Sequence, residues 1–489
     1  MDGQTAVLIG TRQCCRRLEQ QLNLMARRPA TVGWVVLDRD DPDPPGDGDE
    51  PILGDLVALE SVIARTQPSI AIVNFPAVMA ELITSIRTRL RRLGVPDRFM
   101  PTLEDQVAGV GPRTHLEIDH AALLNRSARH FEETAVRELV AGRRVLITGA
   151  GGSIGSELAR QVSRFSPDEL LLVERSENAL FEVDRQIAQF DPDLPRRAIL
   201  HDIVDAEATA EILQLERPDI VFHAAAHKHV PMMEDHPGAA LDNNLFGTKS
   251  IADAAAEAGC DRFVMISTDK AVNPVSIMGA TKRLAELYVQ HMNRTTETGF
   301  SMVRFGNVLG SSGSVLDVWS RQLADGGPVT VTDPEMTRYF MTMPEAASLV
   351  IQAGAIYDPH CPAGEVFLLD MGEPVRIVDL ARRFIEQHGL QPILPGERTS
   401  VDDPGCVNVL YTGARPGEKL FEELAFDSEA MQPTRHPDIM IWQLESPEPD
   451  QIEAMLDRLE PLRTSRQVEL VAGAIRDVLP EMRSAACAA

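Results

Sequence analysis

Residues 148–155 read Thr148-Gly149-Ala150-Gly151-Gly152-Ser153-Ile154-Gly155. The apolar run Arg144–Thr148 leads into this stretch, and a helical pattern follows it. Glycines at 149, 152 and 155 permit a tight turn, close approach of a pyrophosphate and close packing of helix on strand. Backbone N–H groups at the start of the helix favour phosphate. A glycine-rich turn between a strand and a helix predicts a dinucleotide-binding α/β fold.

The strand that follows carries a second cofactor signal. Glu174 ends the apolar run Leu170–Val173 and lies 19 residues after Gly155. A carboxylate at this point can accept from the adenosine ribose hydroxyls and repels a 2′-phosphate. This favours NAD over NADP as the predicted cofactor, although Arg175 follows directly and weakens the inference.

The chain contains two separate series of alternating strands and helices. We therefore predict two doubly wound parallel sheets of the α/β class. The boundaries are residues 1–125 for an N-terminal Rossmann-like domain, 126–142 for a linker helix, 143–440 for a larger domain and 441–489 for a helical tail. Strands of the larger sheet are expected at Arg144–Thr148, Leu170–Val173, Ile220–Phe222, Arg262–Ile266 and Met302–Arg304. From about residue 305 the pattern loosens, which predicts a small cap beside the second sheet.

The N-terminal domain has a weaker version of the glycine turn. Its first strand ends in Gly10-Thr11-Arg12-Gln13-Cys14, which keeps one glycine. A structural or regulatory role is therefore favoured there over a working nucleotide site.

Composition excludes several classes of protein. The chain has 489 residues, 44% of them hydrophobic, and a net charge of −26. That charge disfavours nucleic acid and anionic membranes as partners. Six cysteines without metal-ligand spacing predict no metal site and a reduced, cytoplasmic location. No apolar run reaches the length of a membrane span, and the N-terminus does not read as a signal peptide.

A polar cluster follows the predicted strand Arg262–Ile266. It reads Ser267-Thr268-Asp269-Lys270, at a carboxyl end of the sheet where ligands of such folds bind. Downstream, Met278 and Lys282 are four residues apart and share one face of a helix.

These features together resemble the extended short-chain dehydrogenases/reductases, whose YxxxK pair corresponds to Met278 and Lys282 here. Further stretches narrow the resemblance to CapD-like polysaccharide-biosynthesis proteins, the nucleotide-sugar 4,6-dehydratases that typically act on UDP-N-acetylglucosamine. They are Ala224–Pro231, Ser267–Ala271, Arg304–Ser311, Thr337–Thr342 and Arg415–Leu420. The resemblance covers about residues 130–430, and long members of the family usually begin with membrane helices, which this chain lacks.

The resemblance implies an internal redox cycle. NAD takes hydride from sugar C4, water leaves across C5 and C6, and the hydride returns to C6. Asp269 would be the acid for the C6 hydroxyl and Lys270 the base for C5. Burial would favour the neutral forms that this needs, whereas a direct ion pair would oppose them. We therefore expect the two side chains to address different substrate atoms.

Met278 cannot take a proton, so the group that takes the C4 hydroxyl proton is Lys282, Thr268 or a water. Lys282 is expected to grip the nicotinamide ribose, and Met278 to pack against sugar or nicotinamide. Methionine at this position resembles the long branch of the family, which keeps the C5 configuration.

The resemblance also implies binding residues. The predicted cofactor contacts are Gly149, Gly152, Ser153, Ile154, Gly155, Glu174, Arg175, Asp202, Ile203, Ala224, Ala225 and Lys282. The predicted contacts to the UDP-sugar are Lys228, His229, Asn307, Arg338, Arg415 and Glu418.

Two alternatives remain open. A nucleotide-sugar 4-epimerase would share the hydride step but has no use for the Asp269–Lys270 pair. A non-catalytic UDP-sugar-binding regulator would fit the missing tyrosine. Family members often pair through helices beside the YxxxK helix, so a homo-oligomer is expected by resemblance.

Overall fold

The structure is a computed structural model. It describes residues 5–23, 28–37, 51–76, 79–100, 102, 120–124, 132–356, 365–388, 390–397, 406–415, 417–424, 431–442 and 447–482. The chain forms two compact units: residues 1–119, 322–329 and 382–410, and residues 120–321, 330–381 and 411–489.

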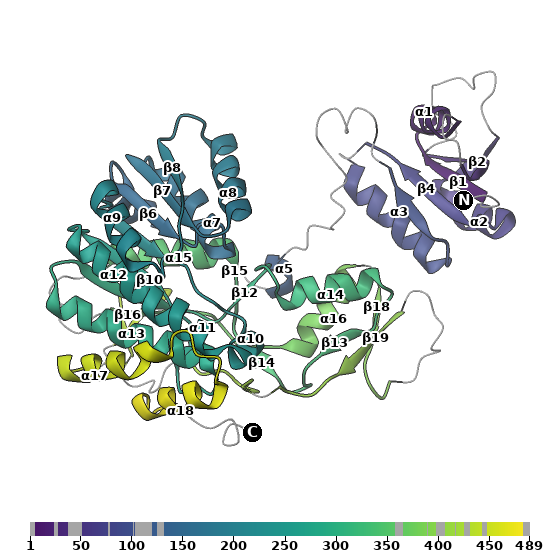
Figure 1. The fold of residues 1–489 in the computed structure, drawn as a ribbon. Helices are drawn as coiled ribbons and strands as arrows, with labels where there is room; N and C mark the ends of the chain where they lie inside the picture. The colour runs from purple at the N-terminus through teal and green to yellow at the C-terminus, as the bar shows by residue number, and fades with distance from the viewer. Residues whose placement is uncertain are drawn as a thin grey trace. The chain divides into compact units, whose positions relative to one another are not determined.

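The first unit contains a parallel five-stranded sheet in the order β3-β2-β1-β4-β5 (Figure 1). Its strands are β1 (Thr5–Gly10), β2 (Ala30–Val36), β3 (Ile52–Asp55), β4 (Ile70–Asn74) and β5 (Asp97–Phe99). Its helices are α1 (Arg12–Asn23), α2 (Leu59–Thr66) and α3 (Ala80–Arg92). Side chains of a strand alternate between faces, so Leu8 joins the core beneath α1 while Ile9 joins the core beneath α2 and α3.

The second unit is built on a nine-stranded sheet in the order β20-β21-β16-β11-β10-β9-β6-β7-β8. Its parallel strands are β6 (Arg144–Thr148), β7 (Glu169–Glu174), β8 (Arg196–Leu200), β9 (Ile220–His223), β10 (Arg262–Ile266), β11 (Gly299–Arg304) and β16 (Glu365–Leu369). Strands β20 (Met431–Pro433) and β21 (Ile439–Trp442) add an antiparallel edge. The direction of winding reverses between β6 and β9, and the crevice at such a point is where doubly wound folds bind ligands.

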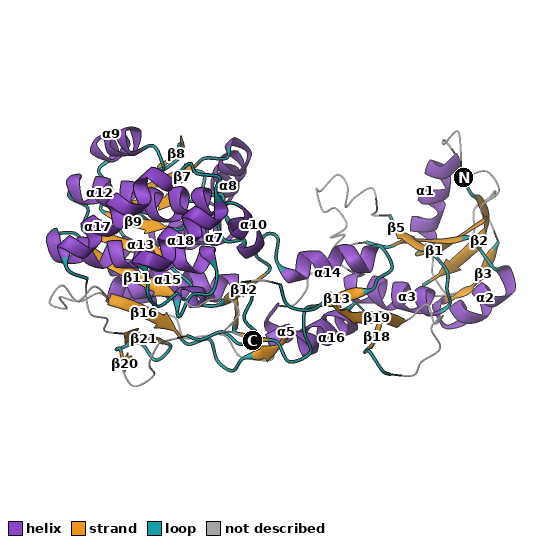
Figure 2. Ribbon diagram, turned by 60° about the horizontal axis from the view of Figure 1, so that its bottom comes forward, coloured by secondary structure: helices purple, strands orange, loops and turns teal. Residues whose placement is uncertain are grey.

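Helices cover both faces of this sheet (Figure 2). Leu146 packs toward α9 (Ala206–Glu216), α12 (Gly247–Glu257) and α13 (Ile277–Thr295). Val145 and Ile147 face the other way, toward α6 (Glu133–Val140), α7 (Ser153–Val162), α8 (Glu177–Phe190) and α15 (Met343–Ile356). The remaining short helices of this part are α5 (His120–Leu124), α10 (Val230–Asp235) and α11 (Pro237–Ala240), followed by a π-helical turn at Leu241–Phe246.

Three small sheets follow residue 305. They pair β12 (Asn307–Leu309) with β15 (Phe340–Thr342), β14 (Thr337–Arg338) with β17 (Val375–Arg376), and β13 (Val329–Val331) and β18 (Gln391–Ile393) with β19 (Cys406–Tyr411). The helices among them are α14 (Val315–Ala324) and α16 (Ile377–Gln387).

Helices α17 (Pro449–Leu459) and α18 (Val468–Val478) belong to the same core as α13. Met455 and Ile475 are buried in that core together with Leu284 and Tyr288 of α13. Arg283 of α13 also pairs with Glu481, 3.1 Å away. The C-terminal helices thus complete the packing around the helix that carries Met278 and Lys282.

The predicted α/β class, with parallel sheets covered by helices, is confirmed. Each strand predicted for the larger sheet lies in a strand of the structure. No helix in the described part of the chain is both long and apolar enough to cross a membrane.

Candidate active site

The glycine-rich turn lies where the sequence places it, between β6 and α7. Gly149 has φ +63°, and a Cβ there would come within 2.8 Å of the Ala225 backbone. A Cβ on Gly155 would lie 2.1 Å from the Gly149 carbonyl oxygen. Both glycines are therefore required by close backbone approach at the switch point between β6 and β9.

A cavity of about 170 Å³ opens beside this turn. Eight of the predicted cofactor residues line it: Gly149, Gly152, Glu174, Arg175, Asp202, Ile203, Ala224 and Ala225. His201, His227 and Asn243 also line it and were not predicted. Ser153 lies nearby and accepts a 2.9 Å hydrogen bond from Ser312 N, whereas Ile154 packs against the core.

Glu174 and Arg175 already have protein partners in this cavity. The Glu174 carboxylate accepts from Gly151 N at 3.2 Å and Ser176 N at 3.0 Å. Arg175 contacts His227 Nε2 at 2.6 Å and lies 3.8 Å from Asp202. The acidic residue thus braces the glycine turn, and its predicted contact to ribose stays a prediction.

His223, at the end of β9, forms a hydrogen-bonded chain beneath the cavity. The Thr248 hydroxyl donates to Asn244 O, so its oxygen accepts from His223 Nε2 at 2.9 Å. His223 Nδ1 then accepts from Thr148 Oγ1 at 2.7 Å. Burial lowers the pKa of His223 to about 3, with a smaller contribution from Lys282, so the imidazole is neutral.

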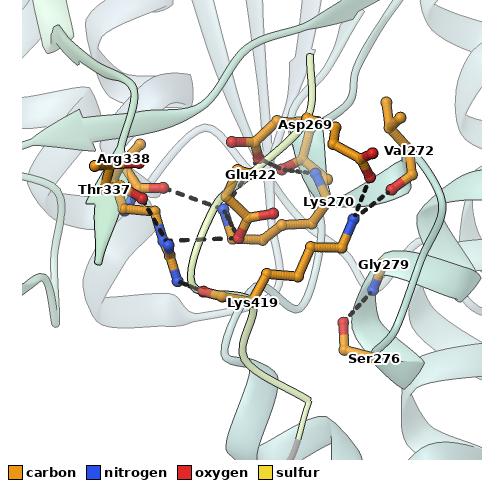
Figure 3. Close-up of polar contacts among 12 residues, drawn as sticks. Asp269, Lys270, Val272, Ser276, Gly279, Thr337, Arg338, Lys419 and Glu422 are labelled. Atoms are coloured by element: carbon orange, nitrogen blue, oxygen red, sulfur yellow. Dashed lines mark hydrogen bonds and ion pairs between the residues drawn. The ribbon is translucent and has the colours of Figure 1, made fainter. Parts of the chain in front are cut away.

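The predicted catalytic cluster follows β10 (Figure 3). Asp269 is fully buried, and its Oδ1 accepts from Thr268 Oγ1 at 2.8 Å and from Lys270 Nζ at 3.0 Å. Asp269 Oδ2 has no hydrogen-bond partner among the described residues. The cluster thus contains one buried carboxylate oxygen that no described residue satisfies.

Contrary to expectation, Asp269 and Lys270 form a direct ion pair. The physical reason is that the Asp269 carboxylate is fully buried and needs a counter-charge, which the neighbouring Lys270 supplies. Lys270 Nζ also donates to Asn307 Oδ1 at 3.1 Å and lies 3.6 Å from Glu422 Oε1. Burial lowers the pKa of Lys270, but the charges of Asp269 and Glu422 outweigh it and raise the pKa overall.

Lys282 and Met278 lie on α13, where both are buried. Lys282 Nζ donates to the Ile266 carbonyl at 2.7 Å. Burial lowers the pKa of Lys282 to about 8, against a smaller opposing effect of Glu286. This lysine is therefore close to giving up a proton at neutral pH.

Several of the predicted UDP-sugar residues make hydrogen bonds within the protein. Lys228 Nζ donates to Ser312 O at 2.7 Å, and Glu418 accepts from Arg415 N at 3.1 Å. A Cβ on Gly313 would lie 3.0 Å from the His229 ring. Asn307 accepts a hydrogen bond from Lys270, as described above. The contacts of all these residues to the UDP-sugar stay predictions.

Arg338 is buried and contacts three residues of the segment 417–424, namely Lys419, Leu420 and Glu422. Figure 3 shows Arg338 beside Lys419 and Glu422. It donates to Lys419 O at 2.7 Å and Leu420 O at 3.1 Å, and its Nε lies 3.6 Å from Glu422 Oε1. Lys419 Nζ donates in turn to Val272 O at 3.0 Å, just after Lys270. Sequence reasoning missed Glu422 and Lys419, although both lie in or beside the stretch Arg415–Leu420.

Comparison with known proteins places these features in a family. A sequence profile described as "Polysaccharide biosynthesis protein" matches residues 145–444. The probable polysaccharide biosynthesis protein EpsC of Bacillus subtilis is 39% identical over 80% of the chain, and the capsular polysaccharide biosynthesis protein CapD of Staphylococcus aureus is 42% identical over 73%. The chain spans 63% and 58% of the lengths of these two relatives.

More distant relatives carry names of two different activities. A UDP-N-acetylglucosamine 4,6-dehydratase (inverting) of Campylobacter jejuni is 32% identical over 58% of this chain and 77% of its own length. A UDP-glucose 4-epimerase of Rickettsia canadensis is 30% identical over 57% of this chain and 76% of its own length. Among solved structures, Pen from Bacillus thuringiensis is 31% identical, with a TM-score of 0.54 over 63% of this chain and 89% of Pen.

Proposed function

The chain belongs to the family of polysaccharide biosynthesis proteins, and we propose that it is a nucleotide-sugar 4,6-dehydratase. The substrate would be UDP-N-acetylglucosamine and the product a UDP-4-keto-6-deoxy-N-acetylhexosamine. The observation that carries this proposal is the pair formed by the buried Asp269 and the half-buried Lys270 at the end of β10. An acid and a base side by side suit an elimination, whereas a 4-epimerase needs neither.

NAD fits the residues around the glycine turn. The cavity is lined by the turn, and side chains at Gly149 or Gly155 would clash with the backbone. The residues proposed to hold NAD are those predicted from the sequence, with Glu174 and Arg175 on the adenosine side and Lys282 on the nicotinamide side. When bound, NAD accepts hydride from sugar C4 and returns it at C6.

The Asp269–Lys270 pair can supply both the acid and the base. Moving one proton from Lys270 Nζ to the Asp269 carboxylate turns the ion pair into a neutral acid and a neutral amine. No other acid or base is needed, because the pair as a whole neither gains nor loses a proton. A bound sugar would exclude water from the pair, and loss of water favours neutral groups over charged ones.

Lys282 is the proposed acceptor of the C4 hydroxyl proton. Met278 cannot take it, and the lowered pKa of Lys282 makes a neutral amine accessible near neutral pH. The hydrogen bond to Ile266 O directs Nζ to the end of β10, where the cluster 267–270 begins.

The remaining assignments follow the resemblance. Residues 143–440 would form the catalytic part, preceded by a separate domain at 1–125 and followed by a helical tail at 441–489. Lys228, His229, Asn307, Arg338, Arg415 and Glu418 would contact the UDP-sugar. Methionine at 278 supports retention of the C5 configuration, and the chain would act as a homo-oligomer in the cytoplasm.

Mass spectrometry of the purified protein with UDP-N-acetylglucosamine, without added cofactor, tests the proposal. We expect the sugar nucleotide to lose one water, and NAD to be released when the protein is denatured. A product of unchanged mass but altered C4 configuration would support the epimerase instead. Binding of the UDP-sugar without any product, even with NAD added, would support the non-catalytic regulator.

A further inference from the structure

Glu422 is a carboxylate buried beside the proposed base. Its side chain is 5% exposed, and Oε1 lies 3.6 Å from both Lys270 Nζ and Arg338 Nε. Its Oε2 is buried and has no hydrogen-bond partner among the described residues. Burying a carboxylate is costly unless a positive charge offsets it. Lys270 and Arg338 supply that charge, so the burial of Glu422 depends on both cations.

The fold holds this carboxylate firmly. Arg338 binds the carbonyls of Lys419 and Leu420, and Lys419 Nζ binds Val272 O, two residues after Lys270. Glu422 therefore reaches Lys270 from a segment that is fastened just before it, at Lys419 and Leu420. Figure 3 shows the Glu422 side chain lying between Lys270 and Arg338.

The charges that face Lys270 are Asp269, Glu422 and Arg338, while Asn307 contributes a neutral oxygen. In the proposed reaction, Asp269 gives its proton to the C6 hydroxyl. Before that transfer Asp269 is neutral, so Glu422 is the carboxylate that still faces Lys270.

We propose that Glu422 is the counter-ion that positions Lys270 and stabilises the ammonium formed when Lys270 takes the C5 proton. This inference rests on the base role proposed for Lys270. In that step the C5–H bond breaks and the proton passes to Nζ. The electron pair forms the C5–C6 double bond, and the C6 hydroxyl leaves as water with the proton from Asp269. Glu422 acts on the reaction only through Lys270, so it is a positioning residue.

Acetylation of the free protein by acetic anhydride tests the charge effect without any turnover. Only neutral amines react, and mass spectrometry can follow Lys270 separately because the chain has five lysines. Glu422→Gln removes a negative charge that raises the pKa of Lys270, so that pKa should fall and the acetylation of Lys270 at pH 7.5 should rise about tenfold. Glu422→Asp keeps the charge and should stay near wild type.

Glu423→Gln is the matched control. Glu423 is the neighbouring carboxylate, with its side chain 44% exposed, and it pairs with Lys419 and Asn273. Its substitution should leave the acetylation rate of Lys270 within twofold of wild type. An unchanged Lys270 rate in a folded Glu422→Gln protein, or an equal rise in the Glu423→Gln protein, would overturn the proposal.

The pH profile of turnover gives the second readout. The acid limb of kcat for Glu422→Gln should move to lower pH, because loss of a negative charge makes it harder for the Asp269–Lys270 pair to take up a second proton, while KM changes little. A higher KM with an unmoved acid limb would assign Glu422 to substrate binding and overturn the counter-ion role. If wild type shows no dehydration, the proposed function fails, and the acetylation result still reports on the Glu422–Lys270 interaction.

Discussion

The Nζ atom of Lys282 lies 2.7 Å from the carbonyl oxygen of Ile266, the last residue of β10. This hydrogen bond joins α13 to the strand that presents Thr268, Asp269 and Lys270. Lys282→Arg keeps a cation and a donor, but a guanidinium does not give up its proton. We expect kcat to fall at least about 100-fold while NAD stays bound. Steady-state kinetics and the NAD content of the purified variant check this, and near-normal kcat would move the C4 base to Thr268 or a water.

Asp269→Asn should abolish dehydration and leave UDP-sugar binding nearly intact. The amide matches the carboxyl group in shape but cannot donate the proton that the C6 hydroxyl needs, so a loss of about 10³-fold in kcat is expected. Calorimetric titration with UDP-N-acetylglucosamine measures binding independently of turnover. Surviving turnover would show that another group is the acid.

Gly149→Ala should remove bound NAD, and Gly142→Ala provides a matched control. Both glycines have positive φ, +63° and +68°, so alanine costs about 1 kcal/mol of stability at either position. Only at 149 would the new Cβ meet backbone, 2.8 Å from Ala225, whereas nothing lies within 4 Å at 142. Melting temperatures and NAD content distinguish the two variants. Equal NAD content in both would refute the role of close approach at Gly149.

His223 should make the second unit less stable in acid. The folded protein keeps this imidazole neutral, with a pKa of about 3, while the unfolded chain takes up a proton near pH 6.5. Its contribution is therefore fully present above pH 6.5 and is lost as the pH falls toward 3. Between pH 7 and pH 5 the loss is about 2 kcal/mol.

His223→Gln can accept from Thr148 and donate to Thr248 without titrating. Urea unfolding at pH 7 and pH 5 should show a smaller acid-induced loss in this variant than in wild type. The same loss in both proteins would mean that His223 is not the group responsible.

Much of this architecture follows from local pattern. The glycine turn and the apolar strands of the larger sheet are predictable because backbone geometry and burial act on neighbouring residues. Strand β8 was not predicted, since its edge position leaves Arg197 and Leu200 exposed and blurs the alternation. The partners of the Asp269–Lys270 pair could not be predicted from local sequence either. Glu422 contacts Lys270 although it lies about 150 residues further along the chain.

One compositional signal could have pointed to the missing residues. Of 47 basic residues, five are lysines, and four of these, Lys228, Lys270, Lys282 and Lys419, lie among the residues described for the site. Lysine differs from arginine in being able to lose a proton and in fitting a single compact charge. In a chain that otherwise uses arginine, Lys419 was therefore a candidate on composition alone.

The packing of α17 and α18 around α13 has a consequence for synthesis of the protein. The core around Leu284 and Tyr288 is completed by residues such as Ile475, which the ribosome adds about 180 residues after the end of α13. At 5–20 residues per second, that interval lasts roughly 9 to 36 seconds. During that time the apolar surface of α13 that α17 and α18 cover in the folded protein lacks its partners. We therefore expect the nascent chain to need chaperones at a stage when its glycine turn and its Asp269–Lys270 pair have already been synthesised.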